Sequence, residues 1–123
     1  MNCASIWLVA HLFTVHTAPG FNGNNYGAGL ECDTQDGYVL QAGEYYNSFR
    51  RPSFYVGGGK LWGDHWQAGL FAGVATGYET RPVAPIGGFL GGYTMDKVRV
   101  QIMLVPPVGE HVGLVHLTLG IRY

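Results

Sequence analysis

The sequence has few charged residues. Asp, Glu, Lys and Arg make up 12% of its 123 residues, about half the share found in ordinary soluble domains. A soluble domain of this size normally covers its surface with such side chains, so much of this surface must either face lipid or be buried against other subunits. The formal net charge is −1, and without a basic patch we expect no nucleic-acid partner.

The sequence also lacks a long apolar run. No stretch approaches the ~20 residues that a transmembrane helix needs. The segment Met1–Ala18 contains the apolar run Ile6–Phe13 but no basic n-region, so we interpret it as a strand rather than a signal peptide. An exported protein would need a signal that these residues do not supply. We expect the outer membrane as the location if the chain is exported, and otherwise a virion or the cytoplasm.

Patterns for disulfides and metals are equally scarce. The two cysteines, Cys3 and Cys32, are too few for a disulfide framework. We expect them to be unpaired small hydrophobic residues, with a bridge between neighbouring strands as the alternative. Several histidines are scattered without metal-ligand spacing, and we expect neither a metal nor a cofactor; they are His16, His65, His111 and His116.

What the sequence does contain is alternation between apolar and polar or small residues, which is typical of strands. Turn signals separate the alternating segments, and Asp33–Gly37 ends in the Asp-Gly pair that tight hairpins require. We find no helix signal of useful length. The pattern predicts one all-β domain over residues 1–123 with about eight strands: Ala4–His16, Tyr26–Cys32, Tyr38–Tyr46, Ser53–Trp62, His65–Tyr78, Ile86–Tyr93, Lys97–Val105 and Val112–Tyr123.

Eight antiparallel strands joined by short turns form an eight-stranded antiparallel up-and-down β-barrel. The strand lengths are near the ~9–11 residues that a tilted strand needs to cross a bilayer. We expect the apolar faces to point outward, toward hydrocarbon, and to leave a narrow lumen. A soluble lipocalin-like barrel has the same strand count but would carry more charge outside. Five residues test this orientation, because each should point away from the lumen: Val98, Val100, Ile102, Leu117 and Leu119.

One hairpin, Gly43–Trp62, combines a polar tip with a glycine-rich arm. Glycines on this arm and on the strand after it should lie side by side, because the two strands follow each other. Small residues facing inward would leave a slot wide enough for an acyl chain. Alternatively, these glycines relieve strand curvature in a tight barrel. The candidate slot residues are Gly57, Gly59, Gly69 and Gly73.

The order of several motifs resembles the PagP-type family of outer-membrane lipid A palmitoyltransferases. The amphipathic helix that precedes the family's barrel has no counterpart in these residues. The resemblance covers nearly the whole barrel and consists of Asn24–Gly29, Tyr45–Ser48 followed by Gly57–Gly59, Gly69–Val74, and Ala84–Ile86 leading to Val100–Pro106. It implies that the chain binds the acyl chain of a phospholipid or of lipid A in a membrane, with transfer to lipid A as its activity if it is active.

The same resemblance places the family's catalytic histidine at His11 and its serine at Ser48. The family's acidic position is Asn47 here, a departure, because an amide can orient an imidazole but cannot stabilise its cation as a carboxylate does. Arg50 and Arg51 could hold a phosphate or a sugar acid. The simpler interpretation is a packed luminal histidine, ordinary turn chemistry and a solvated or headgroup-contacting turn.

The sequence therefore leaves three alternative functions. The first is a PagP-like outer-membrane barrel that binds a lipid acyl chain. The second is a non-enzymatic structural or virion-associated barrel subunit, whose low charge reflects packing against neighbours in a homo-oligomer or larger assembly. The third is a soluble lipocalin-like carrier.

Overall fold

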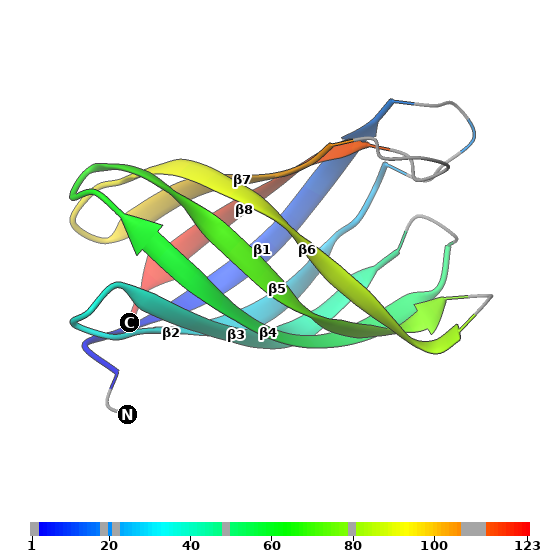
Figure 1. The fold of residues 1–123 in the computed structure, drawn as a ribbon, viewed down its shortest axis with the longest axis horizontal. Coiled ribbons are helices and arrows are strands. Elements are labelled where there is room, and N and C mark those ends of the chain that lie inside the picture. The colour runs from blue at the N-terminus through cyan, green and yellow to red at the C-terminus, as the bar shows by residue number, and fades with distance from the viewer. Residues whose placement is uncertain (1–2, 18–19, 21–22, 48–49, 79–80, 107–112) are drawn as a thin grey trace.

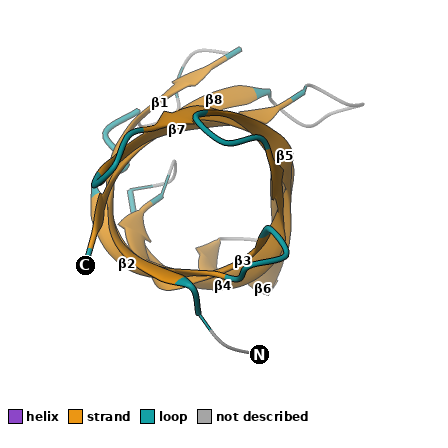
Figure 2. Cartoon of the chain, turned by 90° about the vertical axis from the view of Figure 1, so that its left-hand side faces the viewer, coloured by secondary structure: helices purple, strands orange, loops and turns teal. Residues whose placement is uncertain are grey.

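The computed structural model describes residues 3–17, 20, 23–47, 50–78, 81–106 and 113–123. They form eight antiparallel strands that follow one another around a closed barrel (Figures 1 and 2). The predicted all-β, eight-stranded up-and-down barrel is confirmed. Within these residues, no helix has the length and apolar character to span a bilayer. The strands are β1 (Ser5–His16), β2 (Gly27–Asp33), β3 (Tyr38–Tyr46), β4 (Pro52–Trp62), β5 (Trp66–Tyr78), β6 (Arg81–Thr94), β7 (Val98–Val105) and β8 (Leu114–Arg122).

The apolar faces of the strands point away from the lumen. On β7, Val100 and Ile102 are 42% and 40% exposed, whereas Arg99 between Val98 and Val100 is buried. Leu119 of β8 lies opposite Val100 and Leu117 lies opposite Ile102, and directly opposite residues share one face of a sheet. The orientation predicted for these residues is therefore confirmed.

A bulge on β1 changes the face of one aromatic residue. Strict alternation places Phe13 on the inner face with His11, but Phe13 is 48% exposed. The pairing of β1 with β8 shifts register between His11 and Phe13. Because a bulge inserts one extra residue and reverses the alternation beyond it, Phe13 points outward and Thr14 becomes the next luminal residue.

Strand β6 begins earlier than the sequence predicts. Prolines indicate a loop as far as Pro85, yet the strand starts at Arg81 and includes Pro82 and Pro85. This part of β6 pairs with β5 as far as Arg81, whereas its pairing with β7 begins only at Phe89. The early part of β6 is thus an edge, where a proline that lacks an N–H costs no ladder hydrogen bond.

The expectation of unpaired cysteines was wrong. Cys3 and Cys32 form a disulfide with a Cα–Cα distance of 5.2 Å. The register explains the pairing, because Ile6 lies opposite Cys32 and the backbone N–H of Ala4 donates to the carbonyl of Asp33 (2.7 Å). The bridge therefore joins the start of β1 to the end of β2.

The two ends of the barrel differ. Both chain termini lie at one end, with the short turns that follow β2, β4 and β6 (Figure 1). We call this the terminal end. Strands β1, β3, β5 and β7 end at the opposite end of the barrel, which we call the loop end.

Candidate functional site

The lumen is filled by two kinds of side chain on opposite walls. One wall carries an apolar cluster of Val39, Leu61, Phe71 and Leu90, against which Ile86 and Met103 pack. The other carries most of the buried polar residues, contributed mainly by β1, β2 and β7. The candidate chemistry of the barrel therefore lies in this polar part of the lumen.

His11 lies at the centre of the polar wall. Its Nε2 is 2.7 Å from the Tyr55 hydroxyl and its Nδ1 is 2.9 Å from Nε2 of His116. The other nitrogen of His116, Nδ1, lies 2.8 Å from the Thr14 hydroxyl. The structure thus shows the packed, hydrogen-bonded luminal His11 of the simpler interpretation, with one partner from β4 and one from β8.

The chain of hydrogen bonds continues from Tyr55 to an ion-paired group. The Tyr55 hydroxyl donates to Gln41 Oε1 (2.5 Å), and Gln41 Nε2 donates to Glu31 Oε1 (2.9 Å). Arg99 then binds Glu31 through Nη1 and Asp33 through Nη2.

The directions of these bonds define the tautomers of both histidines. Because Tyr55 donates its proton to Gln41, its oxygen accepts from His11 Nε2–H. A neutral imidazole has one donor and one acceptor, so His11 Nδ1 accepts from His116 Nε2–H, and His116 Nδ1 accepts from Thr14. Every group donates in the same direction, toward Glu31, an arrangement in which successive bonds polarise and strengthen one another.

Two glycines allow Tyr55 to reach His11. Tyr55 lies on β4 opposite Gly43 of β3, and Gly43 lies opposite Gly29 of β2. A Cβ on Gly29 would collide with the Tyr55 hydroxyl oxygen. The phenol therefore lies flat along the inner wall across two strands that carry no side chain at these positions, and its hydroxyl reaches β1.

Arg99 completes the polar wall near the terminal end. Its Nε donates to the Thr94 hydroxyl (2.9 Å), and its guanidinium lies 4.3 Å from the Trp7 ring centroid. The side chains of Arg99 and Glu31 are 6% and 3% exposed, and that of Asp33 is 15% exposed. The guanidinium thus joins two buried carboxylates and an aromatic face.

Asn47, which occupies the family's acidic position in the resemblance, is hydrogen-bonded within the β3–β4 turn, and its predicted catalytic role stays a prediction. Its Nδ2 donates to Ser53 Oγ (3.0 Å) and to the Gly77 carbonyl (2.9 Å), while its Oδ1 accepts from the Arg51 backbone N–H (3.1 Å). Asn47 and Ser53 are fully buried. These bonds tie the β3–β4 turn to the end of β5, where Gly77 has a φ of 85°, as in the interpretation of ordinary turn chemistry.

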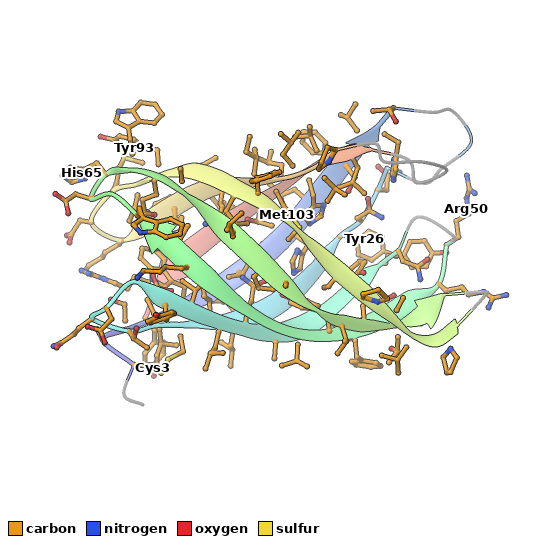
Figure 3. All side chains as sticks on the ribbon, viewed as in Figure 1. Cys3, Tyr26, Arg50, His65, Tyr93 and Met103 are labelled. Carbon is orange, nitrogen blue, oxygen red and sulfur yellow. A yellow bond between two sulfur atoms is a disulfide. The ribbon has the colours of Figure 1, made fainter. Side chains whose placement is uncertain are left out.

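The remaining residues of the predicted site lie at the loop end or outside the described residues. Ser48 is outside them, so its predicted pairing with His11 stays a prediction. Arg50 and Arg51 are exposed in the β3–β4 turn, and Figure 3 shows Arg50 at the loop end. Their predicted contact with a phosphate or sugar acid likewise stays a prediction.

The glycines of the proposed slot lie where β4 and β5 approach closely. Gly57 lies opposite Gly73, Gly59 opposite Phe71, and Gly69 opposite Leu61. A Cβ on Gly57 would lie 2.6 Å from Phe71 Cζ, and one on Gly73 would lie 2.6 Å from the Gly57 Cα. A Cβ on Gly59 would lie 2.9 Å from the Phe71 Cα. This geometry supports the alternative that these glycines permit tight curvature.

Sequence reasoning singled out His11 but not its partners. Alternation already placed Arg99 and Gln101 on the polar face of β7, and His116 on that of β8. It could not show that Arg99 would meet Glu31, because β7 and β2 are separated by β8 and β1 around the barrel. A single Glu between Leu30 and Cys32 in a predicted strand was the available signal for a buried carboxylate.

Comparison with solved structures gives the same fold. A chain from work on de novo design of transmembrane β-barrels superposes with a TM-score of 0.75 at 14% identity, over 100% of this chain and 98% of the other. The N-terminal β-barrel domain of Pseudomonas aeruginosa OprF gives a TM-score of 0.60 at 13% identity, over 100% of both chains. No protein-family model and no curated protein matches the sequence. The barrel therefore has the architecture of transmembrane-type eight-stranded barrels, and the resemblance to PagP-type enzymes rests on the sequence motifs alone.

Proposed function

We propose that the chain is an integral β-barrel of the bacterial outer membrane, whose outer face is solvated by lipid acyl chains. The observation that carries the proposal is a belt of exposed large apolar side chains that extends around all eight strands. Examples from four strands around the ring are Leu8 of β1 (53% exposed), Leu30 of β2 (60%), Val56 of β4 (55%) and Phe89 of β6 (51%). A soluble monomer seldom exposes contiguous apolar patches larger than a few hundred Å², so a continuous belt favours hydrocarbon as the solvent.

Most of the described charged side chains fit this environment. Glu31, Asp33 and Arg99 lie in the lumen, and six others lie in turns: Asp36, Arg50, Arg51, Asp64, Asp96 and Lys97. Arg122, at the end of β8, pairs with Asp96 (2.9 Å), and Glu44 is exposed near the loop end of β3. Lys60 points outward near the terminal end, with its ammonium 4.8 Å from the Tyr38 ring and 5.6 Å from the Trp62 ring. A lysine at an aromatic rim can extend its charged end toward the headgroups.

Aromatic residues mark both ends of the barrel. Figure 3 shows Tyr93 and His65 at the terminal end and Tyr26 at the loop end. Trp66 packs edge-on against Tyr93 with 4.7 Å between ring centroids, and Tyr26 stacks on Tyr46 at 5.4 Å. Two aromatic girdles that flank an apolar band are the pattern of outer-membrane barrels.

The lengths of the connections indicate an orientation. Outer-membrane barrels have short periplasmic turns and longer extracellular loops, which assigns the terminal end to the periplasm. The Cys3–Cys32 bridge lies at that end, and the periplasm is an oxidising compartment in which disulfides persist. The connections therefore support this orientation. The disulfide is compatible with it, although the cell exterior is oxidising as well.

Fractionation of expressed protein tests the proposal. We expect the chain to require detergent or lipid to remain folded, and to migrate as a compact species without heating and as an unfolded one after heating. Detergent-free assemblies would favour a structural or virion-associated subunit. Detergent-free soluble monomers would favour a lipocalin-like carrier, and either result would overturn the proposal.

Binding of a phospholipid or lipid A acyl chain, and its transfer, is the second candidate. The position of His11 supports it, because the residue lies in the lumen with ordered partners on both nitrogens. Incubation with labelled phospholipid and lipid A tests it directly. His11→Ala and Ser48→Ala should each abolish transfer if the predicted pair carries the reaction, whereas Arg50→Ala should change lipid affinity only. Activity retained in either of the first two variants would exclude the pair.

A further inference from the structure

The polar wall forms a continuous seam that runs along the lumen. From the loop end it follows Thr14, His116, His11, Tyr55 and Gln41 to the group formed by Glu31, Asp33 and Arg99. Beyond this group, Arg99 binds Thr94, and Thr94 donates to Gln67 Oε1 (2.7 Å) at the start of β5. The opposite wall carries the apolar cluster, so among the described residues the seam is the polar route that a hydrated species would follow.

The charges on the seam are not balanced. One guanidinium, that of Arg99, binds two carboxylates, those of Glu31 and Asp33. When both carboxylates are ionised, the group carries one negative charge more than Arg99 supplies. A ring or pair of carboxylates in a lumen selects for cations. The seam therefore favours cations over anions as the species that would enter it.

Two atoms beside Arg99 indicate that water reaches this group. Trp7 Nε1, a donor, and Asp33 Oδ1, an acceptor, are buried without a hydrogen-bond partner among the described residues. Trp7 is 2% exposed and its ring lies under the guanidinium. Buried polar groups in native proteins are nearly always satisfied by protein or by water, and the two atoms are a donor and an acceptor beside the same side chain.

We propose that the polar seam is a path for small monovalent cations through the barrel and that Arg99 limits passage along it. The inference rests on the proposed function, because it requires the barrel to span a bilayer. Arg99 restricts the path in two ways. Its positive charge repels cations, and its guanidinium joins Glu31 and Asp33 from β7 across the seam.

Planar-bilayer recordings of the full chain in a KCl gradient test the inference. We expect a small conductance from the native protein. Arg99→Gln should raise the conductance and move the reversal potential toward that of K⁺. Lys60→Gln is the matched control, because it removes one positive charge from the outer face and leaves the seam intact; it should behave as the native protein does.

A second variant keeps the test decisive if Arg99→Gln fails to fold. In the double variant E31Q/D33N, Arg99 remains as the charged member of the group, so the preference for K⁺ over Cl⁻ should fall or reverse. A folded Arg99→Gln variant with native conductance, or a folded double variant with native selectivity, would overturn the cation path. Failure of the native chain to enter the bilayer at all would count against the proposed function instead.

Discussion

An arginine placed on the apolar belt should separate a membrane barrel from a soluble one. Ile102 lies near the middle of β7, is 40% exposed, and has Gly91 and Leu117 as its neighbours on β6 and β8. Met95 lies in the turn between β6 and β7 and is 49% exposed. The two positions have similar exposure but differ in their predicted depth in the bilayer, so they form a matched pair.

The magnitudes follow from the depth. Arg at the bilayer midplane costs about 2–4 kcal/mol in a barrel, and near an interface about 0–1 kcal/mol. We therefore expect Ile102→Arg to reduce the free energy of unfolding by about 2–3 kcal/mol more than Met95→Arg, a factor of about 30–150 in the folding equilibrium. On a soluble surface both substitutions would stay within about 0.5 kcal/mol.

Urea titration of folding into phospholipid vesicles measures the difference, with fluorescence of the three tryptophans as the signal. Ile102→Ala serves as a further control, because it removes the apolar side chain without adding a charge. Equal midpoints for the Ile102→Arg and Met95→Arg variants would refute the claim that the belt faces hydrocarbon.

Three further predictions follow from the lumen and its ends. Reduction of Cys3–Cys32, which are 29 residues apart, should lower stability by about 3–4 kcal/mol in denaturant titration; an unchanged midpoint would show that the bridge does not form. Gly29→Ala should destabilise the barrel by its collision with Tyr55, and in combination with Tyr55→Phe should show a coupling energy of about 0.5–3 kcal/mol in a double-mutant cycle, whereas additive effects would contradict the contact. Asn47→Asp, which restores the family's acid, should cost about 1–3 kcal/mol because a carboxylate cannot donate to the Gly77 carbonyl; gain of acyl transfer without loss of stability would contradict the turn role.

The sequence predicted the barrel well because its physical basis is local. Period-two alternation, as in Val98–Val105, depends only on neighbouring residues, and a closed ring follows once about eight such strands are joined by short turns. The same reasoning failed where pairing with a neighbouring strand decides whether a residue belongs to a strand. Pro85 belongs to a strand because β7 does not yet pair with β6 at that position, and no local pattern contains this information.

The luminal site was less predictable for a related reason. The side chains that meet in it come from β1, β2, β3, β4, β7 and β8, and their contacts depend on the relative register of these strands around the ring. Tyr55 reaches His11 only because Gly43 and Gly29 happen to lie between them. The glycines of this barrel are thus of two kinds: Gly29 and Gly43 let a side chain cross the wall, whereas the glycines that the sequence analysis assigned to an acyl slot let two strands approach.

The polar lumen is a consequence of the apolar exterior. In lipid, apolar side chains gain little by turning inward, so packing and hydrogen bonds hold the interior together. A luminal group such as Arg99 can be retained only if each of its donors is satisfied, because a half-satisfied buried charge is more costly than an apolar residue. Each of the three guanidinium nitrogens of Arg99 donates one hydrogen bond, to Thr94, Glu31 or Asp33. Asp33 Oδ1 and Trp7 Nε1 have no partner among the described residues. At this point two carboxylates share one guanidinium, and the proposed preference for cations rests on that ratio rather than on the number of polar residues.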